Sequence, residues 1–211
     1  MKLTQNGLAL LAGIVRSCMA KRAEEVNCQQ LAFSVNPKMV SMEKFRQVFP
    51  LELETAERLI LFSRNLKKEN IDEEAVALFF GGEDHINYAL KDIRDQGLRN
   101  GMAKIFLIFH MMLPVKITRE KNNSYTGLYV NQGIVIVFKN LQLIPCGDEQ
   151  FEVGQSMFIH YGYIVRLANK KLCQAVLDEQ SDNTRFIDAC MRTYTIDCGK
   201  LLSAFHLMRR Q

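Results

Sequence analysis

The sequence predicts an α+β protein with a helical N-terminal half, a small antiparallel sheet near its middle, and C-terminal helices packed on that sheet. Three observations lead to this prediction. Apolar residues recur every three or four positions through most of residues 1–100, which is typical of amphipathic helices. A dense apolar run at residues 102–113 ends at Pro114, and three strand-like segments follow it. A small sheet with one apolar face needs helices to cover that face.

Residues 1–100 are expected to form a series of helices at 7–27, 42–49, 52–68, 73–80 and 83–96. Ser41 is the expected N-cap of the second helix, and Asn70 or Asp72 of the fourth, because their side-chain oxygens can accept hydrogen bonds from free backbone amides. Pro50 and the pair Gly81-Gly82 are expected helix ends. A short extended piece is expected at residues 31–35.

The sheet is predicted to be a three- to four-stranded meander over about 115–144, with strands at 115–120, 125–130 and 134–138 and an edge strand at 141–144. Residues 155–179 are ambiguous, because their apolar spacing favours a helix whereas residues 158–165 are rich in strand-forming side chains. A helix is favoured here. From Thr184 onwards, one apolar stripe predicts a single C-terminal helix.

Length and composition indicate one globular domain over residues 1–211, with a soft internal boundary near residues 97–101. The chain contains 48% hydrophobic and 24% charged residues and only 4 prolines, which is typical of an ordinary folded protein. Neither 8–15 nor 102–113 approaches the ~20 apolar residues that a membrane-spanning helix needs. No clean cleavage site follows the N-terminal apolar run, so a cytoplasmic location is predicted.

The net charge of +4 is mild and unevenly placed. Residues 1–100 carry 14 basic and 14 acidic side chains, whereas residues 101–211 carry 13 basic and 9 acidic ones. This excess lacks the clustered basic stripe of a dedicated nucleic-acid-binding protein. A helix-turn-helix in the first half is disfavoured, because the candidate recognition helix begins with Asp72, Glu73 and Glu74, which would repel phosphate.

The sequence contains no motif that predicts a catalytic, metal or cofactor site. The six cysteines form no C-x-x-C pair, and His85, His110, His160 and His206 form no zinc-binding pattern. Nucleophile-elbow and phosphate-loop motifs are also missing. The segment Gly81-Gly-Glu-Asp-His85 gathers acids and an imidazole, but it is interpreted as a helix start, where acids are favoured. The sequence leaves open whether a Cys–His or acid–His site is assembled by the fold.

The function predicted from the sequence is a non-enzymatic intracellular interaction protein: an adaptor, a chaperone-like protein or a subunit of a larger complex, such as a secretion or assembly machine. Its expected partner is another protein, and no cofactor is expected. Ten methionines suit an adaptable contact surface. The candidate interaction anchors are Phe79, Phe80, Met111 and Met112. Two alternatives are a nucleic-acid-associated protein that uses the basic second half, and an enzyme whose site is assembled from distant residues.

Overall fold

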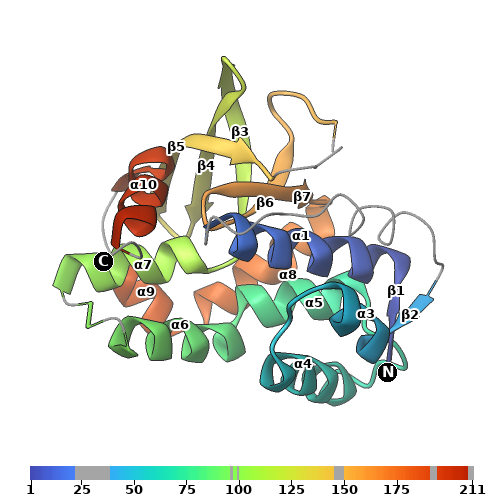
Figure 1. Cartoon of the computed structure of the whole chain (residues 1–211). Helices are drawn as coiled ribbons and strands as arrows, with labels where there is room; N and C mark the ends of the chain where they lie inside the picture. The colour runs from blue at the N-terminus through green and yellow to red at the C-terminus, as the bar shows by residue number, and fades with distance from the viewer. Residues whose placement is uncertain (22–38, 96, 99, 145–149, 191–193, 209–211) are drawn as a thin grey trace.

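A computed structural model of the chain describes residues 1–21, 39–95, 97–98, 100–144, 150–190 and 194–208 (Figure 1). Its helices are α1 (Gln5–Lys21), α3 (Met42–Val48), α4 (Leu53–Asn65), α5 (Glu73–Gly81), α6 (Glu83–Asp95), α7 (Asn100–His110), α8 (Lys170–Ser181), α9 (Thr184–Cys190) and α10 (Cys198–Met208). Its strands are β1 (Lys2–Thr4), β2 (Met39–Ser41), β3 (Leu113–Lys121), β4 (Ser124–Asn131), β5 (Ile134–Leu143), β6 (Ser156–His160), β7 (Tyr163–Leu167) and β8 (Tyr194–Asp197).

The mixed α+β class and the helical N-terminal half are confirmed. Two predicted helix caps are also present. The Ser41 hydroxyl accepts a hydrogen bond from the amide of Lys44 at the start of α3, and the Asp72 carboxylate accepts one from the amide of Ala75 at the start of α5. Local residue chemistry therefore fixes where these helices begin. The extended piece expected at residues 31–35 lies outside the described residues.

The sheet is closed and is not the simple meander that the sequence predicted. Strands β3, β4 and β5 are antiparallel neighbours as expected, but β6 pairs with β3, β7 pairs with β6, and the end of β5 pairs in parallel with β7. In the described part of the chain, β4, β3, β6, β7 and β5 thus form a closed ring of five strands. Residues 141–143 continue β5 beyond Asn140, which has a positive φ of 57°, so no separate edge strand forms there. Closure pairs the backbone groups that an open meander would leave at its edges.

The helix favoured for the first part of residues 155–179 is wrong. Ser156–His160 and Tyr163–Leu167 form the hairpin β6–β7, and only Lys170–Ser181 is helical. The connecting residues Tyr161 and Gly162 have positive φ angles of 52° and 76°, as a tight hairpin turn requires. Aromatic and β-branched side chains that pack on a sheet outweighed the helical spacing of this segment.

The single C-terminal helix predicted from Thr184 is also wrong. The segment is divided into α9, β8 and α10. Strand β8 pairs in parallel with β5, with Tyr194 opposite Ile136 and Ile196 opposite Phe138. β7 covers only the end of β5, so the rest of that edge can supply backbone hydrogen-bond partners to β8. An apolar stripe in the sequence cannot reveal this pairing, which overrides helix propensity here.

Two clusters of buried side chains meet near the end of α7. One lies between the closed sheet and helices α6, α7, α9 and α10, and it includes Met111. The other lies among α1, α3, α4, α5 and α8 beside the β6–β7 hairpin, and it includes Met112. Figure 1 shows this arrangement, with α7 beneath the sheet and α6 below α7. None of the described helices is long and apolar enough to cross a membrane.

Candidate metal centre

Three histidines from distant parts of the sequence meet where the two clusters join. His85 lies in the first turn of α6, His110 is the last residue of α7, and His160 is the last residue of β6. All three are buried, and one ring nitrogen of each lies within 4.8 Å of one from both others. Two nitrogens that each bind a tetrahedral zinc ion at about 2.1 Å lie about 3.4 Å apart. A small inward movement of the rings would therefore bring them to coordination distance.

Main-chain hydrogen bonds hold the segments that carry these histidines. The amide of Tyr161 donates to the carbonyl of Phe109 at 3.0 Å, and the amide of Met112 donates to the carbonyl of Phe80 at 3.1 Å. Gly162 packs so closely against α7 that an added Cβ would lie 2.8 Å from the Phe109 ring. The hairpin turn, the end of α5 and the end of α7 are thus fixed relative to one another.

The side chain of His160 is oriented by α1. Its Nδ1 atom lies 2.7 Å from the hydroxyl of Ser17, and that hydroxyl donates its own proton to the carbonyl of Ile14 at 2.6 Å. Because the hydroxyl has only one proton, it accepts a hydrogen bond from His160, which assigns the proton of the neutral ring to Nδ1. The Nε2 lone pair is then available for a metal ion, which is the usual arrangement at metal-binding histidines.

The side chain of His110 contacts two polar groups through Nδ1. The hydroxyl of Tyr161 lies 2.6 Å from this atom, and a carboxylate oxygen of Asp92 lies 3.7 Å from it. A nearby carboxylate favours a proton on the ring nitrogen that faces it, which again leaves Nε2 as the candidate ligand atom.

The ring of His85 has the least explained environment of the three. Only 6% of the residue is exposed, and neither ring nitrogen has a hydrogen-bond partner among the described residues. Burial lowers the pKa of His85 to about 3, although the nearby main chain of His110 acts in the opposite direction. The ring is therefore neutral near pH 7, which is the protonation state that binds metals. A buried polar group left without a partner costs about 1–3 kcal/mol, so its retention calls for an explanation.

A small pocket of about 120 Å³ lies beside the histidines. His85 and His110 line it together with Tyr161 and Asp92. The rest of the lining comes from α1, the segment between α3 and α4, and nearby aromatic residues: Ile14, Val15, Cys18, Met19, Pro50, Leu51, Glu52, Thr55, Phe80 and Tyr88. The Asp92 side chain is 46% exposed, so the pocket extends from the buried imidazoles towards solvent.

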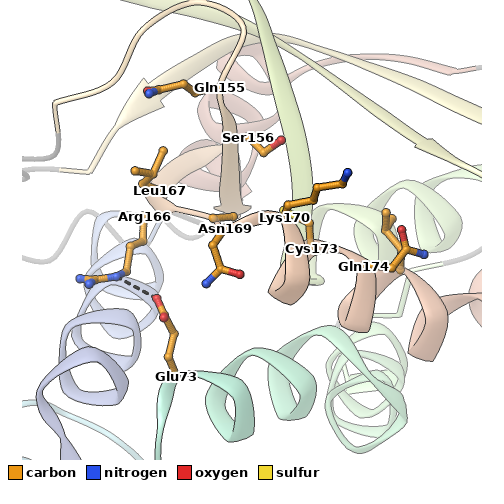
Figure 2. Close-up of a pocket in the computed structure, with 11 residues that line it drawn as sticks. Glu73, Gln155, Ser156, Arg166, Leu167, Asn169, Lys170, Cys173 and Gln174 are labelled. Carbon is orange, nitrogen blue, oxygen red and sulfur yellow. Dashed lines mark hydrogen bonds and ion pairs between the residues drawn. The ribbon is translucent and has the colours of Figure 1, made fainter.

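A larger hollow of about 580 Å³ lies on another face, around the connection between β7 and α8. Figure 2 shows Glu73 and Arg166 joined by an ion pair at 3.0 Å on one side of it, with Asn169 and Cys173 at the start of α8. Asn169 caps α8 by accepting a hydrogen bond from the amide of Leu172. Burial raises the pKa of the Cys173 thiol, which keeps it protonated near pH 7. Glu73 and Arg166 satisfy each other and Asn169 is engaged in the helix cap, so this hollow is a weaker candidate than the histidine cluster.

The structure places the predicted interaction anchors in the protein core. Each is 3% exposed or less, and none presents a surface to a partner in this conformation. These residues are Phe79, Phe80, Met111 and Met112. Of the segment Gly81–His85, only His85 joins the histidine cluster. Glu83 is exposed on the helix start, and burial raises the pKa of Asp84.

The fold brings a cysteine towards the histidines, as the sequence left open. The sulfur of Cys18 lies 4.0 Å from Nδ1 of His160 and lines the small pocket. The other described cysteines lie elsewhere, and burial raises the pKa of Cys190 to about 12. No spacing rule in the sequence could have found the histidine cluster. The only signal was an imidazole that interrupts an apolar run, as His110 does at the end of residues 102–113.

Fold and site together define an α+β protein with a closed sheet and a buried three-histidine cluster at the junction of two cores. No protein-family model matches the chain, and searches of curated proteins and of solved structures found no significant match.

Proposed function

We propose that the protein binds one divalent first-row transition ion through His85, His110 and His160. The observation that carries this proposal is the fully buried His85 ring, whose nitrogens lack hydrogen-bond partners among the described residues while two further imidazole nitrogens lie within 4.8 Å. A metal ion would satisfy all three rings at once. His110 and His160 are each held by groups from other parts of the chain, so two of the three rings are oriented without an ion.

The competing explanation is a set of ordinary core histidines packed against aromatic rings. Phe80 does pack against His85, with ring centroids 4.7 Å apart and planes tilted by 60°, and Phe106 lies near His110. However, a core position that needs only aromatic packing is filled better by phenylalanine, which has no polar atoms to desolvate. Three imidazoles in one buried site therefore support a role that uses their nitrogens.

The ligand type narrows the choice of ion. Neutral imidazole suits zinc, copper, nickel and iron, whereas magnesium and calcium prefer oxygen ligands. Three protein ligands around a tetrahedral ion match the zinc sites that keep one open position. Zinc is therefore the first candidate, and cobalt is its spectroscopic substitute.

The test is isothermal titration of the metal-free protein with Zn²⁺, together with elemental analysis of protein purified without chelators. We expect one zinc ion per chain. The variant His85→Phe keeps an aromatic ring but removes a ligand, so its affinity should fall by more than about 100-fold, because losing a group that merely orients a ligand already costs about 10- to 100-fold. His206→Phe changes the fourth histidine of the sequence, on α10, and is the matched control.

A circular dichroism spectrum and a melting curve for each variant separate lost ligands from lost folding. X-ray absorption at the zinc edge should give three nitrogen scatterers from imidazole at about 2.0 Å. If folded His85→Phe protein binds zinc as tightly as the wild type, the histidine cluster is a packing feature and the proposal fails.

The interaction role predicted from the sequence stays a prediction, as does the nucleic-acid alternative. A metal centre made by α6, α7 and β6 fits best with the other alternative predicted from the sequence, an enzyme whose site is assembled from distant residues. It is compatible with catalysis and with a structural or regulatory ion.

A further inference from the structure

The small pocket touches the histidine cluster on one side only. His85 and His110 line it, whereas the lining does not include His160, which is held by Ser17 of α1. An ion bound by all three nitrogens would therefore have the pocket on the side away from His160. Three protein ligands leave one position of a tetrahedral ion for an outside ligand.

We infer that the fourth coordination position faces this pocket and accepts an exchangeable small molecule, normally water. This inference rests on the proposed metal centre. The pocket volume of about 120 Å³ limits the size of the molecule. Liquid water occupies about 30 Å³ per molecule, so the pocket holds about four waters or one compound of similar total size.

The walls of the pocket define the class of molecule. Most lining side chains are apolar, and the charged ones are the carboxylates Glu52 and Asp92, with no lysine or arginine among the described lining residues. The guanidinium carbon of Arg58 lies 5.1 Å from the centre of the Tyr88 ring. Arg58 also forms an ion pair with Glu54 at 3.4 Å. The carboxylates of Glu52 and Asp92 offset the double positive charge of the bound ion, so the site gives an anion no net electrostatic advantage over a neutral ligand. The expected ligand is small and uncharged, with a nitrogen or carbonyl oxygen that can bind the metal.

Such a position would give the centre a chemical use. A metal ion acts as a Lewis acid on a bound carbonyl oxygen, and it lowers the pKa of a bound water to near 7. A closed structural site with four protein ligands offers neither effect. The location of the pocket therefore favours a reactive or ligand-sensing centre over a purely structural one.

The experiment uses the full chain loaded with Co²⁺, whose visible absorption reports its ligands. Imidazole is the uncharged probe and azide the anionic probe. We expect imidazole to shift the cobalt bands saturably while the cobalt content stays at one per chain. Azide should bind more weakly. Glu52→Gln should strengthen azide binding about twofold with little change for imidazole, because it removes one negative charge from the pocket lining without touching a histidine.

Thr55→Leu is the pocket-filling variant. Thr55 is buried, lines the pocket and has no role as a ligand, so the larger side chain should weaken imidazole binding at least tenfold while cobalt affinity is retained. Glu57→Gln, on the exposed face of α4, is the charge control for Glu52→Gln and should leave both probes unchanged.

The outcomes separate the two proposals. If cobalt and zinc fail to bind, the proposed function and this inference both fail. If cobalt binds but its spectrum is insensitive to imidazole and pH, the metal centre stands and the open position is refuted. A saturable imidazole shift that Thr55→Leu removes supports the inference. A shift that Thr55→Leu leaves intact would mean that the probe reaches the metal by another route, which overturns the role assigned to this pocket.

Discussion

The hydroxyl of Ser17 lies 2.7 Å from Nδ1 of His160, although 143 positions separate the two residues in the chain. Both are fully buried, and Ser17 also donates to the carbonyl of Ile14 within its own helix. One side chain of α1 thus sets both the orientation and the tautomer of a candidate metal ligand on the sheet. This contact links the N-terminal helix to the chemistry of the site.

Replacing Ser17 with alanine should weaken zinc binding. The variant removes the acceptor that holds the Nδ1 proton of His160, and the loss of such a group typically costs about 10- to 100-fold in metal affinity. Isothermal titration with Zn²⁺ measures the change. Ser63→Ala is the matched control, because Ser63 is equally buried and donates to the carbonyl of Leu59 one turn back without touching a histidine. Equal affinity in both variants would show that Ser17 does not orient a ligand.

Gln180 should be a major contributor to stability. Its amide nitrogen donates to the carbonyls of Gly81 and Met112, and its amide oxygen accepts from the hydroxyl of Tyr129. The residue is fully buried, so Gln180→Leu would remove three hydrogen bonds from buried groups and should reduce the free energy of unfolding by about 2–4 kcal/mol.

Urea denaturation measures the effect of Gln180→Leu. The control is Gln174→Leu in the same helix, where the exposed amide bonds only to Asp178 and the expected change is below about 0.5 kcal/mol. A loss for Gln180→Leu as small as that of the control would mean that the buried network contributes little.

Gly162 should tolerate no side chain. Its φ is 76°, and an added Cβ would lie 2.8 Å from both the Cβ of Cys198 and the ring of Phe109. Gly162→Ala should therefore cost about 3 kcal/mol, from left-handed strain and overpacking together. Gly133→Ala separates the two contributions, because φ is 80° there but nothing lies within 4 Å, so strain alone should cost about 1 kcal/mol. Similar melting temperatures for the two variants would contradict the close packing of the turn on α7.

The free energy of unfolding of the metal-free protein should decrease as the pH is lowered, because His85 is buried in its neutral form. Burial lowers its pKa in the folded protein to about 3, from 6.5 in the unfolded chain. Between these values the unfolded chain binds a proton that the folded chain does not, so the free energy of unfolding decreases as pH falls below about 6.5. One proton corresponds to at most about 1.4 kcal/mol per pH unit. Above about pH 6.5 the ring is neutral in both states and adds no pH dependence.

Urea denaturation between pH 5 and 7 tests this prediction. The variant His85→Phe should show a shallower dependence on pH, by up to one proton, whereas His206→Phe should follow the wild type. Parallel curves for His85→Phe and wild type would indicate that the pKa of His85 is the same in the folded and unfolded protein, contrary to its burial.

The sequence by itself determined the α+β class, the helical N-terminal half and the ends of several helices. Those features depend on contacts within a few residues, such as the Ser41 and Asp72 caps, so local chemistry is enough to predict them. Where local signals conflicted, the prediction followed apolar spacing. It missed the hairpin at 156–167 and strand β8, whose stability comes from pairing with β3 and β5.

Only the tertiary structure decided the sheet closure and the candidate site. His85, His110 and His160 belong to three elements, and His160 is oriented by Ser17, which is remote in sequence. A ligand set that forms across a fold leaves no periodic trace in the chain, because the spacing along the sequence carries no information about which segments will pack together. Local sequence also could not tell an interface residue from a core residue. Phe79 and Met112 are apolar enough to suit an interface, but the fold buries them in the core.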